Sequence, residues 1–168
     1  MAAISHKQLA QWYEAHGTDL MLYARQWSAD QQAEDVVQDA FIKLLKQRTC
    51  PDNVRAWLFR VVRNNSISLV RRLQRRRRAR KQSRQRETLW FESRTDDLID
   101  AQLVQDLLQT LPSNLREIVL LRIWGQMSLK EISKIVNKSI PWVHHDYREA
   151  LEMIRKKLER SSCDTKKV

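Results

Sequence analysis

The stretch Ser128–Leu158 constrains the fold most tightly. It reads SLKEISKIVNKSIPWVHHDYREALEMIRKKL. Ser128 is followed three residues later by Glu131, and this spacing is a capping box that marks the start of a helix. Apolar residues then recur on one helical face, at Leu129, Ile132, Ile135 and Val136. The spacing predicts a short amphipathic helix that begins at Ser128.

A second helix follows after a very short turn. Asn137 tolerates the left-handed backbone that ends a helix. Ser139 is a second N-cap, and Pro141 falls in the first turn, where its missing N–H costs nothing. We expect the second helix to continue through Leu158, with Val143, Tyr147, Leu151 and Ile154 on its apolar side. Two helices joined in this way form a helix-turn-helix, although a helical hairpin inside a core would show the same pattern.

The rest of the chain favours an all-α fold. Its 168 residues include only two Gly and three Pro, and it lacks long alternating runs of β-branched residues. The two cysteines and four histidines show no metal-ligand spacing, so we expect no metal and no cofactor. No stretch approaches the roughly 18 apolar residues of a membrane span. These features predict a reduced cytoplasmic protein without membrane insertion.

Charge divides the chain into parts. The net charge is +11, which is typical of a protein that meets a polyanion. Residues 71–86 hold ten basic residues and no acidic one, whereas residues 87–110 hold six acidic residues and one basic. We expect two small helical domains, 1–80 and 97–160, joined by a flexible linker at 81–96.

The N-terminal domain is expected to contain three helical regions. The first spans 8–27 and is interrupted or bent at Gly17. The second spans 33–46, with an apolar stripe at Val36, Val37, Ala40, Phe41, Leu44 and Leu45 and a polar face at Glu34, Asp35, Gln38 and Asp39. The third begins near Val54 and carries Asn64 and Asn65 in its middle, where asparagine is a poor helix former. In the C-terminal domain, a helix ends at Leu111 and Ser113 caps the next.

Three segments now point to a family. AEDVVQDAFIKLL, NVRAWLFRVVRNNSISLVRR and the segment from Leu111 to Leu158 occur in an order and at a spacing that resemble a bacterial RNA polymerase sigma factor of the extracytoplasmic function group. The resemblance covers almost the whole chain except the extreme termini and the linker. It implies that 1–80 is sigma region 2 and that 97–160 is sigma region 4.

The resemblance implies roles for the N-terminal residues. Glu34, Asp35, Gln38 and Asp39 would dock on core RNA polymerase. The third helix would melt and read the −10 promoter element through Arg60, Arg63, Asn64, Asn65, Ser68, Arg71 and Arg72. The basic run, with Arg75, Arg76, Arg77 and Arg78, would contact DNA phosphates, and the acidic linker would thread through the polymerase. Trp57 and Phe59 are interpreted as core residues, and Ser68 stands where many relatives carry Asp or Asn.

In the C-terminal domain, the resemblance implies that the helix-turn-helix binds the −35 element in the major groove. The candidate residues are Lys138, Ser139, Trp142, His144, His145 and Arg148. Three positions depart from the family pattern: Asn137 replaces a usual Gly, Pro141-Trp142 replaces small residues, and Asp146 stands where a basic residue is common. The base contacts therefore do not transfer from relatives.

The resulting expectation is a sigma factor with core polymerase and promoter DNA as partners and no enzymatic activity. Many relatives are also held by an anti-sigma factor. One alternative is a stand-alone helix-turn-helix transcriptional regulator, which would need a ligand-binding or dimerisation domain. A second is a DNA recombinase or nuclease, for which Tyr147 is the nominal nucleophile, although it lies on the apolar side of its helix.

Overall fold

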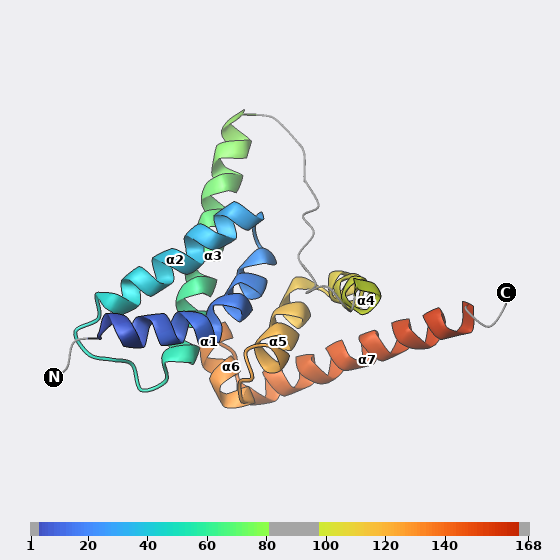
Figure 1. Ribbon diagram of the computed structural model, residues 1–168. Helices are drawn as coiled ribbons and strands as arrows, with labels where there is room; N and C mark the ends of the chain where they lie inside the picture. The colour runs from blue at the N-terminus through green and yellow to red at the C-terminus, as the bar shows by residue number, and fades with distance from the viewer. Residues whose placement is uncertain (1–3, 81–97, 165–168) are drawn as a thin grey trace. The chain divides into compact units, whose positions relative to one another are not determined.

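The computed structural model describes residues 4–80 and 98–164, which are helical apart from short connections (Figure 1). The helices follow in the order α1 (His6–Arg25), α2 (Asp30–Leu45), α3 (Val54–Arg80), α4 (Leu98–Thr110), α5 (Ser113–Ile123), α6 (Leu129–Val136) and α7 (Ile140–Asp164). They form two units, Met1–Trp90 and Phe91–Val168. The all-α, two-domain prediction is confirmed, while the predicted linker at 81–96 lies outside the described residues.

The first unit is a bundle in which α1, α2 and α3 pack against one another. Its core is built from side chains of all three helices that are at most 1% exposed, among them Leu20, Tyr23, Val37, Leu44 and Phe59. Phe59 is a core residue as predicted, whereas Trp57 is only partly buried. The outer part of α3 extends beyond the bundle (Figure 1).

Helix α1 is continuous through Gly17, where the sequence predicted an interruption or a bend, and it changes direction midway along its length (Figure 1). Its start is fixed by Ser5, whose Oγ accepts a hydrogen bond from the Gln8 backbone N–H while the Gln8 side chain accepts from the Ser5 N–H. Gly17 is buried and has ordinary helical backbone. Tertiary packing therefore outweighs the intrinsic helix cost of one glycine, which is about 1 kcal/mol.

The second unit is organised around α7, which packs against α4, α5 and α6. Ile118, Leu121, Met127, Ile132 and Val143 are at most 1% exposed and form its core. Helix α5 does not begin as expected. Pro112 is its N-cap, and the Pro112 carbonyl accepts the Arg116 N–H at 2.9 Å, so Ser113 is already the first helical residue and does not cap.

Arg116 joins α5 to the end of α4. Its guanidinium donates hydrogen bonds to the carbonyls of Leu108, Gln109 and Leu111 at 2.9, 3.1 and 3.0 Å. These carbonyls belong to the last turn of α4 and the residue after it, where the helix itself supplies no donors. Burial lowers the pKa of Arg116 from its usual value. The cation nevertheless suits the negative end of the α4 dipole, so this contact fixes the end of α4 on α5.

Gly125 makes the turn between α5 and α6 sensitive to substitution. Its N–H donates to the Leu120 carbonyl at 3.0 Å, and a Cβ added here would lie 2.5 Å from the Leu121 carbonyl oxygen. Because that oxygen is backbone, we expect Gly125→Ala to lower the free energy of unfolding by about 1–3 kcal/mol. Urea unfolding of the full chain measures this loss.

Gly17→Ala is the matched control for Gly125→Ala. A Cβ at Gly17 would meet only the Tyr13 ring, at 3.7 Å, which is ordinary contact. Since alanine also restricts the unfolded chain, we expect this variant to be more stable by about 0.5–1 kcal/mol. Losses of equal size in both variants would contradict the close approach at Gly125.

Within the described ranges, every helix is too short or too polar to cross a lipid bilayer.

Candidate nucleic-acid interface

Helix α2 presents the predicted polar face to solvent. Glu34, Asp35 and Gln38 are exposed, and Gln38 Nε2 donates to Glu34 Oε1 at 3.1 Å. The face continues toward the C-terminal end of α2 with Ile42 and Leu45, which are 50% and 37% exposed. The sequence placed Leu44 and Leu45 in one apolar stripe. Packing against α1 and α3 buries Leu44 but leaves Leu45 exposed. The assignment of Leu45 to that stripe is therefore wrong, and the polar face ends in exposed apolar side chains.

Asp39 differs from its neighbours on this face because it bonds to α3. Its Oδ2 accepts from Asn65 Nδ2 and lies against Lys43 Nζ, each at 2.8 Å. Lys43 Nζ also donates to Asn65 Oδ1 at 2.8 Å. Asp39, Lys43 and Asn65, the Asp39 cluster, therefore close a triangle between α2 and α3. The amide of Asn65, assigned above to −10 DNA, is directed at α2 in this structure.

Asn64 and Asn65 can be separated by experiment. Asn65→Ala removes two hydrogen bonds of the Asp39 cluster, so we expect the free energy of unfolding to fall by about 1 kcal/mol. Asn64 is exposed, and Asn64→Ala should leave stability unchanged or slightly raised because alanine is the better helix former. Thermal unfolding of the two variants checks this. A larger loss for Asn64→Ala would contradict the assignment.

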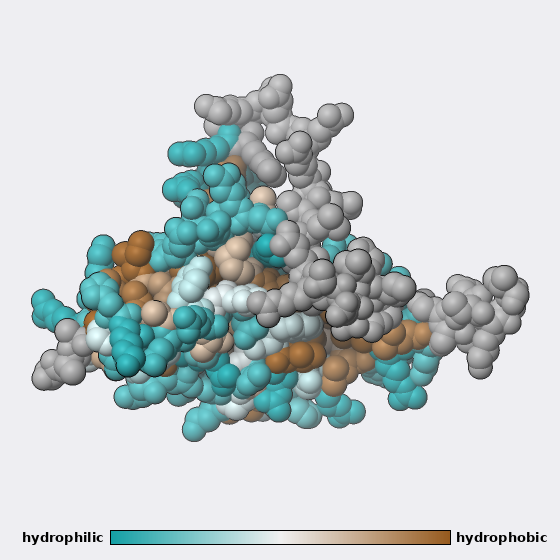
Figure 2. Space-filling view, viewed as in Figure 1, coloured by the Kyte–Doolittle hydropathy of each residue, from teal (hydrophilic) through white to brown (hydrophobic). Residues whose placement is uncertain are grey.

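The outward face of α3 carries one continuous polar stripe. Its members are all exposed and are separated by three or four residues: Arg60, Asn64, Ser68, Arg71, Arg75 and Arg78. Arg78 lies 18 positions after Arg60, in five steps, so the mean step is 3.6 positions, which is the period of the helix. The stripe therefore stays on one side of α3 for about 27 Å at 1.5 Å per residue. Figure 2 shows the outer part of α3 covered by hydrophilic side chains.

Three other predicted arginines lie off this stripe. Arg72 and Arg76 are exposed but follow the stripe residues by one position, about 100° around the helix. Arg63 is half-buried on a different side of α3. The side chain of Arg77 is outside the described part of the molecule. The resemblance assigned these arginines to one DNA-binding segment, whereas in the helix neighbouring arginines point to different sides.

A groove marks the outer end of the stripe. Among the described residues it is lined by Arg71, Gln74, Arg75 and Arg78, and its volume is about 410 Å³. The three guanidinium groups can only donate hydrogen bonds, and the amide of Gln74 adds an NH₂ donor. This excess of donors suits phosphate oxygens, which accept hydrogen bonds. The groove is therefore a candidate site for the backbone of a nucleic acid.

The turn between α6 and α7 forms as the sequence predicts. Ser128 Oγ accepts the Glu131 N–H at 3.2 Å while the Glu131 carboxylate accepts the Ser128 N–H at 2.8 Å. Asn137 has φ 57° and ψ 50°, the left-handed conformation. Ser139 Oγ accepts the Trp142 N–H at 3.3 Å. Both predicted N-caps and the predicted left-handed residue are confirmed, so the helix-turn-helix is present.

Lys138 and Trp142 contact each other at the start of α7. Lys138 Nζ lies 5.0 Å from the centroid of the Trp142 ring, a cation–π contact. The Trp142 ring is half-buried, whereas Lys138 and Ser139 are exposed. The unusual Pro141-Trp142 pair thus holds a lysine beside the N-terminus of α7. A cation at this end adds to the positive helix terminus, and together they favour an anion such as phosphate.

The exposed face at the start of α7, named the reading face after its predicted −35 role, is narrow. His144, His145 and Arg148 are exposed, as predicted, while Val143 and Ala150 are fully buried on the opposite side. Leu151 is 41% exposed and does not belong to the apolar side. Glu149 and Glu152 are also exposed and would repel phosphates, so the face suited to DNA is confined to the first turns of α7.

Asp146 is not on the reading face. It is 5% exposed, and its Oδ2 accepts from Asn114 Nδ2, at the start of α5, at 3.0 Å. A basic side chain at this buried position could not accept the Asn114 hydrogen bond and would carry an unpaired charge. This explains why Asp146 replaces the basic residue that is common here. The pair joins residues that are 32 positions apart, so no local pattern in the sequence could have identified it.

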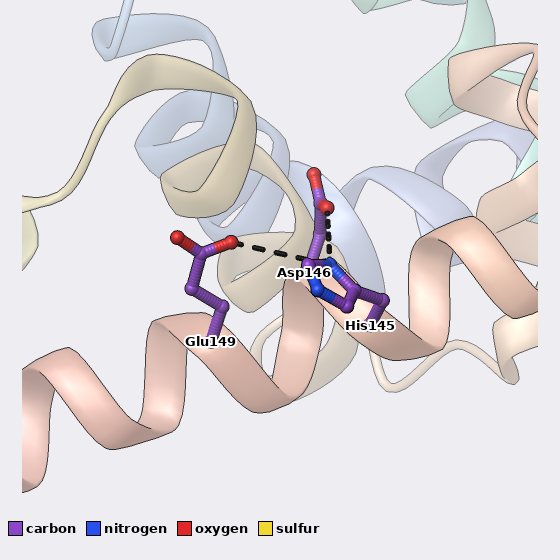
Figure 3. A group of neighbouring side chains, drawn as sticks. All are labelled: His145, Asp146 and Glu149. Carbon is purple, nitrogen blue, oxygen red and sulfur yellow. Dashed lines mark hydrogen bonds and ion pairs between the residues drawn. The ribbon is translucent and has the colours of Figure 1, made fainter.

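Asp146 also approaches His145, and Glu149 lies nearby (Figure 3). His145 Nδ1 is 3.3 Å from Asp146 Oδ1 and 4.0 Å from Glu149 Oε2. The potential ligand atoms of the three residues all lie within 4.8 Å of one another. The sequence did not single out this group as a metal site, and the hydrogen bonds of Asp146 account for the geometry without one.

Comparison with known proteins agrees with this arrangement. Sigma-70 region 2 matches residues 12–77 and Sigma-70 region 4 matches residues 101–154. The sigma factor RpoE from Bartonella quintana, solved in complex with the anti-sigma factor NepR, has a TM-score of 0.77 and 21% identity, covering 91% of this chain and 98% of that one. CnrH, solved with the cytosolic domain of CnrY, has a TM-score of 0.63 and 25% identity, covering 93% and 90%. No curated protein sequence matches the chain.

The two family matches coincide with the two helical units. Region 2 covers part of α1, all of α2 and most of α3, and region 4 covers α5, α6, and parts of α4 and α7. The chain therefore belongs to the sigma-70 family of RNA polymerase sigma factors, in the extracytoplasmic function group.

Proposed function

We propose that this sigma factor binds core RNA polymerase and directs promoter-specific initiation, with the first unit on the −10 element and the second on the −35 element. The observation that carries the proposal is that each unit presents its own DNA-compatible face. One is the stripe along α3, and the other is the exposed start of α7. A chain with two such faces can contact two separated elements of one promoter.

The first unit would act on opened DNA. Asn64 lies on the stripe between Arg60 and Ser68, and its amide offers both a donor and an acceptor to a base edge. Bases must leave the stack before their edges can be read fully. The arginines farther along α3 would hold the phosphates of the adjoining DNA. We therefore assign base capture to Asn64 and keep Asn65 in the Asp39 cluster.

The second unit would act on duplex DNA. The start of α7 enters the major groove, as the recognition helix of a helix-turn-helix does. His144, His145 and Arg148 would face base edges, and arginine can contact guanine with two hydrogen bonds. Lys138, Ser139 and the helix N-terminus would hold a phosphate and set the register. Trp142 would hold Lys138 through the cation–π contact and would contact DNA only with the edge of its ring.

Helix α2 would dock on core polymerase. Glu34, Asp35 and Gln38 provide a polar and negative surface, and Ile42 and Leu45 continue it with exposed apolar side chains. Negative charge steers association with a basic partner, and apolar contacts then contribute affinity. Asp39 would contribute mainly by fixing α2 against α3.

An anti-sigma factor is a further partner that we propose. The similar RpoE structure is a complex with the anti-sigma factor NepR, and CnrH was solved with the cytosolic domain of CnrY. An inhibitor of this chain would cover the same docking and DNA-reading faces that polymerase and promoter need. Competition between such a protein and core polymerase for the purified chain would test this partner.

Reconstituted transcription tests the proposed function. The full chain is mixed with purified core RNA polymerase and a promoter template, and run-off transcripts are measured against core polymerase alone. We expect discrete transcripts only when the chain is present. A stand-alone regulator would instead bind DNA without forming a stable complex with core polymerase, and it would yield no transcript from any template.

A further inference from the structure

His145 differs from its neighbours on the reading face because one ring nitrogen lies against a buried carboxylate, that of Asp146. The imidazole side chain is 75% exposed, whereas the Asp146 side chain is 7% exposed. Asp146 Oδ2 accepts a hydrogen bond from Asn114 Nδ2 on α5 at 3.0 Å. Its other oxygen, Oδ1, lies 3.3 Å from His145 Nδ1 (Figure 3). The chain of contacts runs from α5 through Asp146 to an exposed imidazole.

This geometry has a consequence for the imidazole. A carboxylate oxygen can only accept a hydrogen bond, so the ring nitrogen that faces it must carry a proton. In a neutral imidazole the other nitrogen is then an acceptor. The same device, a carboxylate behind a histidine, fixes the tautomer of histidines in metal sites. Glu149 adds a second carboxylate on the Nδ1 side, at 4.0 Å.

We propose that Asp146 is a positioning residue that directs the proton of the neutral His145 imidazole to Nδ1, so that in this form the exposed Nε2 accepts a hydrogen bond from an exocyclic amino group in the DNA major groove. The proposal rests on the proposed −35 role of α7. In the major groove, amino donors are presented only by cytosine N4 and adenine N6. Guanine offers acceptors there, which an Nε2 acceptor cannot use. His145 would therefore select a base pair that places C or A toward α7.

His144 provides the internal comparison. It is exposed on the same helix but makes no hydrogen bond or ion pair with any described residue. Its tautomer is therefore free to follow the solvent or the base that it meets. The two adjacent histidines should differ in proton position although both are exposed.

The first test reads the tautomer directly in the full chain without DNA. Long-range ¹H–¹⁵N NMR at pH 7.5 in the presence of EDTA distinguishes the two neutral tautomers and the imidazolium by their nitrogen shifts, and His145→Ala identifies the signals. We expect His145 as the neutral Nδ1–H form. An Nε2–H ring or an imidazolium would overturn the proposal.

Two variants test whether Asp146 is the cause. Asp146→Asn can keep its oxygen on Asn114 and turn its NH₂ toward His145, so the proton should move to Nε2. Glu149→Gln, whose partner distance exceeds that of a hydrogen bond, should leave the tautomer unchanged. If Asp146→Asn fails to fold, the wild-type and Glu149→Gln spectra still decide. A shift in Glu149→Gln would overturn the assignment to Asp146.

The second test reads base preference. Full-chain protein is bound to duplexes that vary one base pair at a time across the −35 element. We expect wild type to favour C or A at one position by about fivefold to tenfold, as one hydrogen bond allows, and His145→Ala to lose this preference only there. Unchanged preference in His145→Ala would overturn the reading role. Absence of promoter-dependent transcription by wild type would instead refute the proposed function, leaving the NMR result intact.

Discussion

Replacing Arg71 and Arg75 by alanine should make promoter binding much less sensitive to salt. Both side chains lie on the outward stripe of α3 and line the groove at its end. Each neutralised phosphate contributes about −0.9 to the slope of log affinity against log salt concentration. We therefore expect the slope to become less steep by about 1.8. Binding of labelled promoter DNA by the holoenzyme between 50 and 200 mM salt measures it.

Arg72→Ala/Arg76→Ala is the matched control for this prediction. It removes the same charge from the same helix, but these side chains point about 100° away from the stripe. If direct contact determines the slope, the control should change it by less than half as much. Equal slopes in the two double variants would mean that total charge acts at a distance, and the stripe would then have no special role.

Placing positive charge on the polar face of α2 should weaken binding to core polymerase. Asp35→Lys/Gln38→Lys places two lysines on an exposed face without disturbing the Asp39 cluster. A like-charge contact costs several kcal/mol, so we expect the dissociation constant to rise about 100-fold. Fluorescence titration of labelled sigma factor with core polymerase measures the affinity.

The choice of residues matters for that experiment. Asp39→Lys would also break the contacts with Lys43 and Asn65, so a weaker complex could reflect a distorted bundle. Glu14→Lys is the control, because Glu14 is exposed on α1 and the variant introduces a lysine in the same unit. Affinity that falls equally for Glu14→Lys and the α2 variant would argue against a specific docking face.

Local rules account for what the sequence predicted well. The Ser128 capping box, the left-handed Asn137 and the Ser139 cap each depend on hydrogen bonds or backbone angles within a few residues. Their signals are therefore complete in a short stretch of sequence. The exposed positions of the polar residues on α2 and α7 also followed from helical periodicity, because one side of each helix is apolar.

Tertiary contacts account for what the sequence missed. Asn65 meets Asp39 across 26 positions, and Asn114 meets Asp146 across 32 positions. Neither pair has a local pattern, since both depend on how two helices pack. The same reason applies to Leu45, because periodicity identifies an apolar face but the neighbouring helices decide where it ends. The side chains that support the reading faces are thus visible only in the folded protein.

One chain that reads two promoter elements with two separate units should select both elements at once. The most direct measurement is transcription from a library of randomised promoters by the reconstituted holoenzyme, followed by sequencing of the templates that yield transcripts. We expect two selected sequence blocks at a fixed spacing, with Asn64→Ala weakening the downstream block and Arg148→Ala the upstream one. A single selected block, or transcripts no more selective than those of core polymerase alone, would contradict it.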